Sequence, residues 1–198
     1  MKSSRYRLAI ADSEANVRDQ LTASLERAGH EIVVCAADGQ SLVAGCLRTS
    51  LDLVITEMHL SDMDGVTAAT LIHKHHDIPI VFSSADSDET SIEQAGACHA
   101  YSYLLKPIRA EEVDALVHLA VVQHRELITL RGAVTVARQQ LADRKVIERA
   151  KGVLMTRKSL SEQEAFSQLK HAARSERQQM VMVARSLLLA EGLLGFAR

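Results

Sequence analysis

Five short apolar runs, each followed by a segment with helical periodicity, occupy residues 1–109 and constrain the fold of this chain most strongly. The runs lack regular polar alternation, as expected for strands that are buried on both faces of a parallel sheet. They are Leu8–Ala11, Ile32–Cys35, Leu53–Ile55, Ile80–Phe82 and Tyr101–Leu105. This alternation predicts a doubly wound α/β domain with five parallel strands, of the flavodoxin-like kind.

Charge is distributed unevenly along the 198 residues. Residues 1–122 contain 9 basic and 18 acidic side chains, whereas residues 123–198 contain 14 basic and 7 acidic ones. Such a separation favours two modules with different partners, and the basic module is the candidate for binding nucleic acid. With three Tyr, three Phe and no Trp, the chain is poor in aromatic platforms for base stacking.

The sequence also bears on the cellular compartment. No apolar segment is long enough to cross a membrane, and the first residues lack the pattern of a signal peptide. The cysteines Cys35, Cys46 and Cys98 are odd in number and lack metal-ligand spacing, so we expect buried thiols in a reducing environment. These features predict a cytoplasmic protein that does not contact a membrane.

Polar side chains follow four of the predicted strands, at the edge where ligands bind in open α/β sheets. Asp12 follows the first strand, Glu57 the third, Ser83 and Ser84 the fourth, and Lys106 the fifth. Carboxylates can hold Mg²⁺, while a hydroxyl and an ammonium can hold phosphoryl oxygens. The sequence therefore predicts a pocket for phosphate and metal at this edge.

The first 120 residues or so resemble the receiver domain of two-component response regulators, over about residues 5–122. The segments that carry the resemblance are Leu8–Glu14, Asp52–Met58, Leu60–Gly65 and Tyr103–Pro107. By this resemblance, Asp12 belongs to the acidic Mg²⁺ pocket and Ser84 is the switch hydroxyl. In the same way, Tyr103 is the switch aromatic residue and Lys106 the phosphate-sensing lysine.

Two residues depart from the receiver pattern. The family has an aspartate, the phosphoacceptor, where this chain has Glu57, and usually a second acid where this chain has Ser13. The longer side chain of Glu57 should reach toward Ser84 and Lys106, into space that a phosphoryl group would fill. It should also be able to pair with Lys106 without any metal.

The neighbouring acids decide whether metal or phosphate can still bind. Glu14 lies one position beyond Ser13 and is expected to point elsewhere, so the Mg²⁺ site at Asp12 should be weak or absent. An alternative is that Asp62 or Asp64 accepts the phosphoryl group, although these two acids are better placed to shape a turn. The sequence favours a receiver domain that does not go through cycles of aspartate phosphorylation and dephosphorylation.

The segment from about Ala110 to Met155 has few helix breakers and predicts one long helix. An apolar heptad that starts at Val113 and includes Ala120 runs through it, and its cleanest stretch is Leu127–Leu141. Two heptads are marginal alone, so the seam could pack within the chain, but we expect a parallel coiled-coil homodimer.

The last 55 residues predict three helical segments with short loops, which together make a compact bundle. The second segment begins at Ser161 with Glu164 in a capping box, and the third begins near Ser175. We therefore divide the chain into a receiver-like domain (1–122), a coiled-coil linker helix (123–143) and a small three-helix domain (144–198).

This last domain resembles the ANTAR domain of bacterial transcription antitermination regulators over about residues 135–190, above all in Ile147–Met155. The family binds paired hairpins in nascent leader RNA and prevents termination, which implies a regulator without enzymatic activity. Basic side chains attract phosphate backbones, so Arg149 and Lys151 are the first candidate RNA contacts, supported by Arg144 and Lys145. Each of them could instead be a solvated helix charge.

Two other functions stay open at this point. One is a DNA-binding response regulator, although the sequence has no helix-turn-helix signature. The other is an interaction module, in which a sensor protein docks on the receiver and sequesters the output. The second alternative is compatible with RNA binding.

Overall fold

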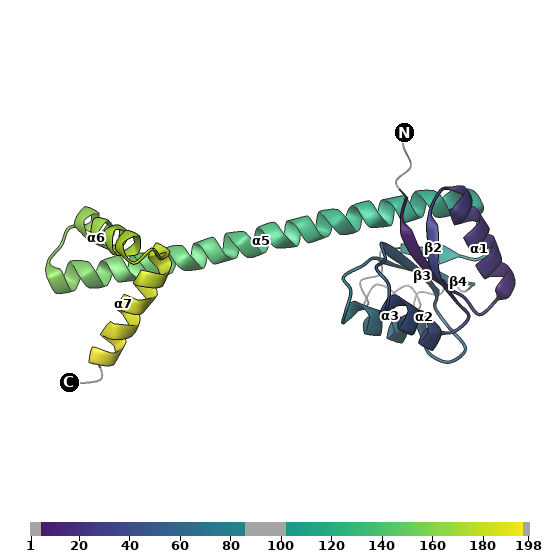
Figure 1. Cartoon of the computed structure of the whole chain (residues 1–198), viewed down its shortest axis with the longest axis horizontal. Helices are drawn as coiled ribbons and strands as arrows, with labels where there is room; N and C mark the ends of the chain where they lie inside the picture. The colour runs from purple at the N-terminus through teal and green to yellow at the C-terminus, as the bar shows by residue number, and fades with distance from the viewer. Residues whose placement is uncertain (1–4, 86–101, 196–198) are drawn as a thin grey trace. The chain divides into compact units, whose positions relative to one another are not determined.

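The computed structural model describes residues 5–85 and 102–195, and the chain divides into two compact units, Met1–Ile128 and Thr129–Arg198. Figure 1 shows the sheet in the first unit and helices α6 and α7 in the second. The long helix α5 (Ala110–Lys158) begins in the first unit and ends in the second, so the predicted long helix is confirmed.

The first unit is a five-stranded parallel sheet with helices on both faces, as the sequence predicts. The strands are β1 (Arg7–Ala11), β2 (Glu31–Ala36), β3 (Leu53–Glu57), β4 (Ile80–Ser84) and β5 (Ser102–Leu105), in the order β2-β1-β3-β4-β5. Helices α1 (Ala15–Arg27) and the start of α5 cover one face, while α2 (Gly39–Cys46) and α3 (Gly65–His73) cover the other. The strand order reverses between β1 and β3, where such sheets bind ligands.

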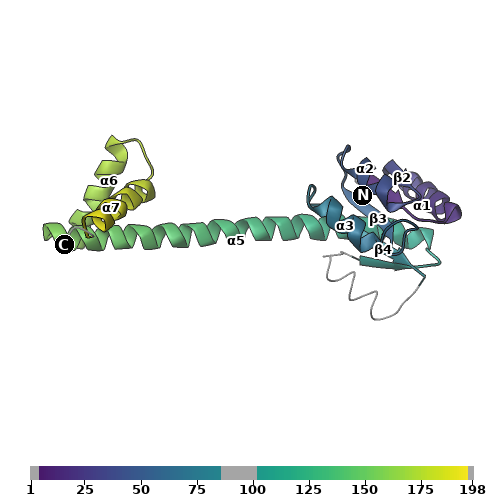
Figure 2. The ribbon, with the colours of Figure 1, turned by 90° about the horizontal axis from the view of Figure 1, so that it is seen from below.

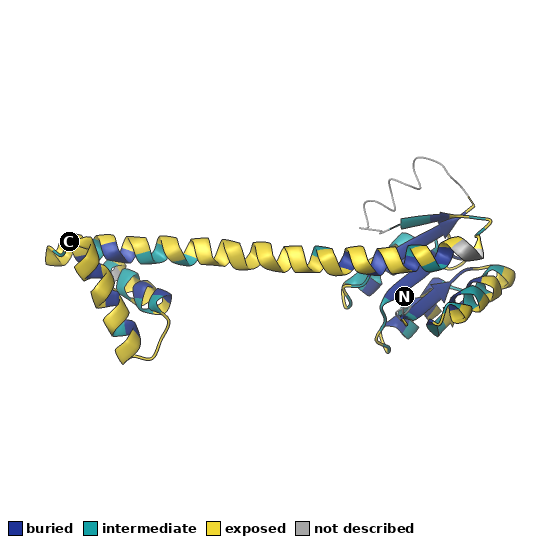
Figure 3. Cartoon of the chain, turned by 90° about the horizontal axis from the view of Figure 1, so that it is seen from above, coloured by how far each residue is buried: buried dark blue, intermediate teal, exposed yellow. Residues whose placement is uncertain are grey.

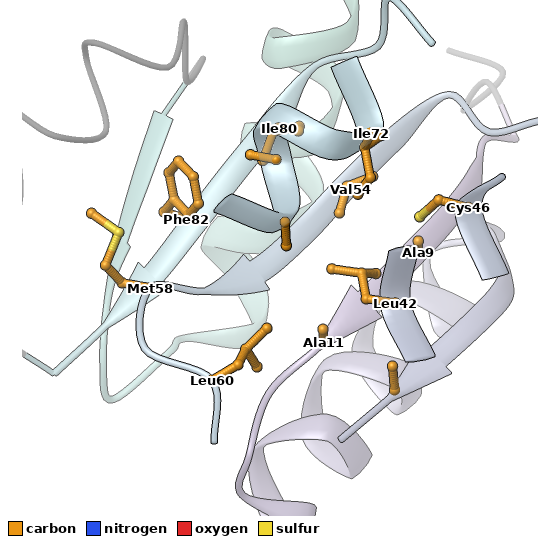
Figure 4. Packing of buried hydrophobic residues seen from close by; sticks show 13 residues of the cluster. Ala9, Ala11, Leu42, Cys46, Val54, Met58, Leu60, Ile72, Ile80 and Phe82 are labelled. Atoms are coloured by element: carbon orange, nitrogen blue, oxygen red, sulfur yellow. The ribbon is translucent and has the colours of Figure 1, made fainter. Parts of the chain in front are cut away.

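Successive side chains of the strands enter opposite halves of the core, because the side-chain period of a strand is two. On β1, Leu8 and Ile10 pack with α1 and α5, while Ala9 and Ala11 pack with α2 and α3. Figure 4 shows the cluster on the side of α2 and α3, to which Phe82 of β4 contributes the largest side chain. Full burial of one such large side chain stabilises the fold by about 1.5–3 kcal/mol.

Helix α5 changes its surroundings along its length. Its first turns are part of the core of the first unit, where Val113 and Ala120 are buried. The beginning of the predicted heptad is therefore intramolecular, because these side chains cover the sheet. Further along, large apolar side chains at Leu130, Val134 and Leu141 are exposed, and the middle of α5 is almost entirely exposed in Figure 3.

In the second unit, α6 (Glu162–Ser175) and α7 (Met180–Gly195) pack with the end of α5, as Figure 2 shows. The capping box of Ser161 and Glu164 is present at the start of α6, as predicted. The predicted start of a helix near Ser175 is wrong. Ser175 ends α6, its hydroxyl donating to the carbonyl of Ala172, and the left-handed backbone of Arg177 (φ 54°) then separates the two helices.

Two further expectations concern cysteines and membrane spans. Cys46 is buried as expected, but Cys35 is exposed, and Cys98 lies outside the described residues. Within the described ranges, no helix is both long and apolar enough to cross a membrane.

Candidate functional site

The carboxyl ends of β1, β3 and β5 bring Asp12, Glu57 and Lys106 together, as the sequence predicts. The ammonium nitrogen of Lys106 lies 2.6 Å from Oε1 of Glu57 and 2.9 Å from Oδ2 of Asp12. Asp12 is fully buried, and the side chains of Lys106 and Glu57 are 10% and 14% exposed. Water therefore screens these ion pairs less than it screens surface pairs.

The carboxylate of Glu57 is also held from the side of β1. Its Oε2 accepts hydrogen bonds from the backbone N–H (2.9 Å) and the hydroxyl (2.5 Å) of Ser13. Burial by itself would raise the pKa of Glu57, but the hydrogen bonds from Lys106 and Ser13 outweigh it and hold the pKa below the usual 4.5. Ser13 is thus a hydrogen-bond donor to Glu57, a role that sequence reasoning did not assign to it.

The same contacts act on Lys106. Burial would lower the pKa of its ammonium, but hydrogen bonds and charge attraction from Glu57 and Asp12 outweigh burial and raise it above its usual value. Both partners of the Glu57–Lys106 pair are therefore charged at neutral pH. The pairing without metal that the longer glutamate side chain predicts is present.

Glu14 departs from expectation, because it points into the pocket. Its Oε1 lies 3.3 Å from the ammonium nitrogen of Lys106. Glu14 stands at the N-cap of α1 but makes no capping hydrogen bond with its side chain, so the carboxylate can lean toward the lysine. The pocket therefore contains three acids, Asp12, Glu14 and Glu57.

Close packing around β3 fixes the position of Glu57. Gly65, the first residue of α3, approaches the strand so closely that an added Cβ would lie 2.3 Å from the carbonyl oxygen of Glu57. The N–H of Gly65 donates to the carbonyl of Met58, and the N–H of Met58 donates to the carbonyl of Ser83. Any side chain at residue 65 would therefore push α3 away from the strand end that carries Glu57.

The two residues that the resemblance names as switch residues, Ser84 and Tyr103, lie on β4 and β5. Ser84 is buried, and its carbonyl accepts the N–H of Lys106 at 2.8 Å. Tyr103 is half-buried and packs against the core cluster that contains Phe82. Ser84 is the last residue of β4, and Tyr103 is the second residue of β5.

Asp62 and Asp64, the alternative acceptors, are engaged with helix N-termini. The carboxylate of Asp62 accepts the N–H groups of Gly39 (2.7 Å) and Gln40 (3.0 Å) at the start of α2. These bonds, first that from Gly39, lower the pKa of Asp62. Asp64 caps α3 by accepting the N–H of Val66 at 3.1 Å. Both acids therefore shape the loop between β3 and α3.

The acid cluster also has the chemistry of a metal site. One ligand oxygen from each of Asp12, Glu14 and Glu57 can be chosen so that all three lie within 4.8 Å of one another. Oδ2 of Asp12 is buried and, among the described residues, accepts no hydrogen bond despite its closeness to Lys106. Three carboxylates fit a hard divalent cation, but here the ammonium of Lys106 stands among them.

The basic candidates on α5 separate into two kinds. Arg144, Lys145 and Arg149 are exposed, and no carboxylate in the described ranges forms an ion pair with them. The side chain of Lys151 is only 8% exposed, and its ammonium lies 2.8 Å from Glu148 and 2.7 Å from Glu162. Lys151 therefore joins α5 to the start of α6, whereas the other three basic residues face the solvent.

Charged contacts also hold α7 against α5. Arg157 of α5 forms an ion pair with Glu191 of α7, and Arg185 of α7 lies 3.1 Å from Asp143 of α5. These pairs frame the apolar contacts around Ala150 and Ala184. The exposed basic residues are therefore presented on a helix that is fixed from two sides.

Comparison with known proteins identifies two domains. The model of the response regulator receiver domain matches residues 8–118, and that of the ANTAR domain matches residues 136–188. The transcriptional regulatory protein PdtaR of Mycobacterium tuberculosis is 36% identical over 182 residues, which cover 92% of this chain and 89% of that protein.

Two similar solved structures each cover about 60% of this chain. A two-component response regulator from Clostridium difficile is 27% identical, with a TM-score of 0.56 over 60% of this chain and 97% of that one. The chemotaxis protein CheY4 of Vibrio cholerae has the same TM-score at 19% identity, over 59% of this chain and 99% of that one. The second likeness shows the fold alone.

Proposed function

Because the chain belongs to the response regulators, with a receiver domain followed by an ANTAR domain, we propose that it regulates transcription by binding hairpins in nascent leader RNA and preventing termination. The observation that carries this proposal is the face of α5 on which Arg144, Lys145 and Arg149 are exposed and without described ion pairs. Cations that are not neutralised by the protein are available to phosphates. The protein would act in the cytoplasm, where nascent RNA is made.

A direct comparison of nucleic acids tests this function. The full chain is titrated with an RNA that contains two small hairpins and with duplex DNA of the same length, at the same salt concentration. We expect tighter binding to the RNA, and binding that weakens as salt rises because counterions are released. Equal or tighter binding to the DNA would instead support a DNA-binding response regulator.

We propose that the receiver does not carry a stable phosphoryl group at residue 57. The ion pair of Glu57 with Lys106 supports this, because it engages the lysine that the family uses to sense phosphate. The hydrogen bonds from Ser13 hold the same carboxylate on its other side. The carboxylate of Glu57, held by Lys106 and Ser13, already places a negative charge where a phosphorylated receiver would have its phosphoryl group.

Magnesium, if it enters this pocket, would be held by Asp12, Glu14 and Glu57, and would supply the positive charge that phosphoryl transfer requires. We propose that such binding is weak. The ammonium of Lys106 already lies within 3.3 Å of all three carboxylates, so it would have to be displaced. Isothermal titration with MgCl₂, on the wild type and on Lys106→Ala, tests this: removal of the ammonium should tighten binding.

We propose a homodimer that forms through α5. Leu130, Val134 and Leu141 are 49–57% exposed, and they follow the heptad spacing of a coiled-coil seam. A second copy of the same helix would remove these side chains from water at about 25 cal/mol for each Å² of apolar surface. Such a dimer would present two ANTAR domains to one RNA with two hairpins.

We propose that a sensor protein docks on the receiver domain and supplies the regulatory signal. A cavity of about 790 Å³ lies between α1 and the start of α5, and its apolar lining includes Val17, Leu21, Ile108 and Val113. It adjoins Glu14 and Lys106, so a partner that fills it would also meet the acid–lysine pocket. This input is compatible with an RNA-binding output.

A further inference from the structure

A groove lies between α5 and α7 within the C-terminal unit. It has a volume of about 510 Å³ and is lined by Arg149, Gly152, Val153 and Thr156 of α5 and by Leu188 and Gly192 of α7. This volume falls within the range of roughly 300–1,000 Å³ that is typical of sites for small ligands. The groove is therefore large enough for one unit of a larger ligand.

Two of the residues that line the groove, Gly152 and Gly192, are glycines, which leave space beside the helices. A Cβ added at Gly152 or at Gly192 would meet no atom within 4 Å. Val153 and Leu188 add apolar side chains to the lining of the groove. A flat group can thus lie against the two helices without displacing any side chain.

Polar groups lie along the same groove. The hydroxyl of Thr156 can both donate and accept a hydrogen bond. The ion pair of Arg157 with Glu191 lies in the same lining and fixes α7 to α5. The groove therefore combines apolar walls with hydrogen-bonding groups, held by a braced pair of helices.

Arg149 connects this groove to the exposed basic surface. It lines the groove, and it also lines a second hollow of about 450 Å³ together with Arg144 and Lys145. None of the three has an ion-pair partner among the described residues. A polyanion on the basic surface would therefore run past the mouth of the groove.

We propose that this groove receives one unstacked nucleobase from a loop of the bound RNA, while Arg144 and Lys145 hold the adjoining phosphates. The inference rests on the proposed RNA binding and names the part of the RNA that the domain reads. Bases in loops can splay out of the stack and lie against arginine planes, which is the role of Arg149 at the mouth. Because the chain has few aromatic residues, the apolar groove replaces an aromatic stacking platform.

The test uses the full chain and an RNA selected on it from a pool of double hairpins with randomised loops. The variant Gly152→Leu fills the groove. The control Gly132→Leu adds the same side chain to an exposed part of α5, where an added Cβ also meets nothing within 4 Å. Both changes replace glycine by a stronger helix former, so both proteins should keep their helicity by circular dichroism.

Each loop base of the selected RNA is then replaced in turn by an abasic nucleotide. We expect one position at which the abasic RNA binds the wild type about tenfold more weakly, since stacking of one base contributes on this scale. Gly152→Leu should weaken binding of the intact RNA by a similar factor and show no further loss with that abasic RNA. Gly132→Leu should behave as the wild type with both RNAs.

Three outcomes overturn the proposal, and they are distinguishable. If the wild type selects no RNA from the pool, the proposed function itself fails, and the groove has no base to receive. If the wild type binds RNA but Gly152→Leu binds it as tightly as Gly132→Leu, the groove proposal alone fails. If the loss of affinity from Gly152→Leu and the loss from each abasic position are additive, the groove and that base do not contact each other, and the groove proposal fails as well.

Discussion

The ammonium of Lys106 lies 2.6 Å from the carboxylate of Glu57, the last residue of β3. Ser13 donates two hydrogen bonds to the same carboxylate. The pocket therefore balances its charges within the protein, with three acids around one lysine. The carboxylate of Glu57 is therefore held from two sides, by Ser13 and by Lys106.

Incubation with acetyl phosphate and Mg²⁺ should leave the intact mass of the wild type unchanged. The reason is that residue 57 is a glutamate whose carboxylate is engaged by Lys106 and Ser13. Mass spectrometry of the whole protein checks this. A gain of one phosphoryl group that disappears in Glu57→Ala would contradict the prediction.

The pH dependence of the protein's stability under acidic conditions should depend on Glu57. The pKa of Glu57 is held below 4.5 in the folded state. Its contribution to the free energy of unfolding is therefore present above pH 4.5 and is lost as the pH falls through the lowered folded-state pKa. We expect Glu57→Gln to lower the free energy of unfolding by about 1 kcal/mol at pH 7, where the pair is charged but partly open to water.

Urea unfolding at a series of pH values from 7 to 2 measures this difference. The free energies of unfolding of wild type and Glu57→Gln should become equal at the lowest pH, because the carboxyl group of the wild type is then protonated and uncharged. The matched control is Glu26→Gln on α1, where no ion pair is described. A difference between wild type and Glu57→Gln that stays constant with pH would show that packing, and not charge, is lost.

The double variant Leu130→Asp/Val134→Asp should be a monomer, because it places charge in the apolar seam. Sedimentation across a range of concentrations measures the mass. The control Ile128→Asp/Val136→Asp removes two exposed apolar side chains and adds the same charge outside the heptad positions, so it should stay dimeric. Equal masses for all three proteins would mean that this segment does not join two chains.

Arg149→Ala and Lys151→Ala should have different effects. Arg149 is exposed without a described ion pair, so its loss should weaken RNA binding by on the order of 1–3 kcal/mol and leave thermal unfolding unchanged. Lys151 is buried between Glu148 and Glu162, so its loss should lower the melting temperature. Circular dichroism and RNA titration of both variants separate the effects, and wild-type RNA affinity in Arg149→Ala would remove that residue from the interface.

Local patterns in the sequence determined much of the fold. Consecutive apolar residues on β1, such as Ile10 and Ala11, predict a strand buried on both faces, because successive side chains of a strand point to opposite faces of the sheet. The capping box of Ser161 and Glu164 predicts the start of α6 because its bonds join residues only three apart. Asp12, Glu57 and Lys106 could be placed together because parallel strands end at one edge of a sheet.

The tertiary structure decided what the remaining side chains contact. Val113 fits a coiled-coil heptad, yet it is buried because the sheet is the apolar surface within reach. Glu14 turns toward Lys106 and Lys151 turns toward Glu162, since each meets an opposite charge from a segment distant in the sequence. Periodicity indicates which face of a helix is apolar or charged, but the partner of that face depends on which elements pack together, and that is fixed only in the folded chain.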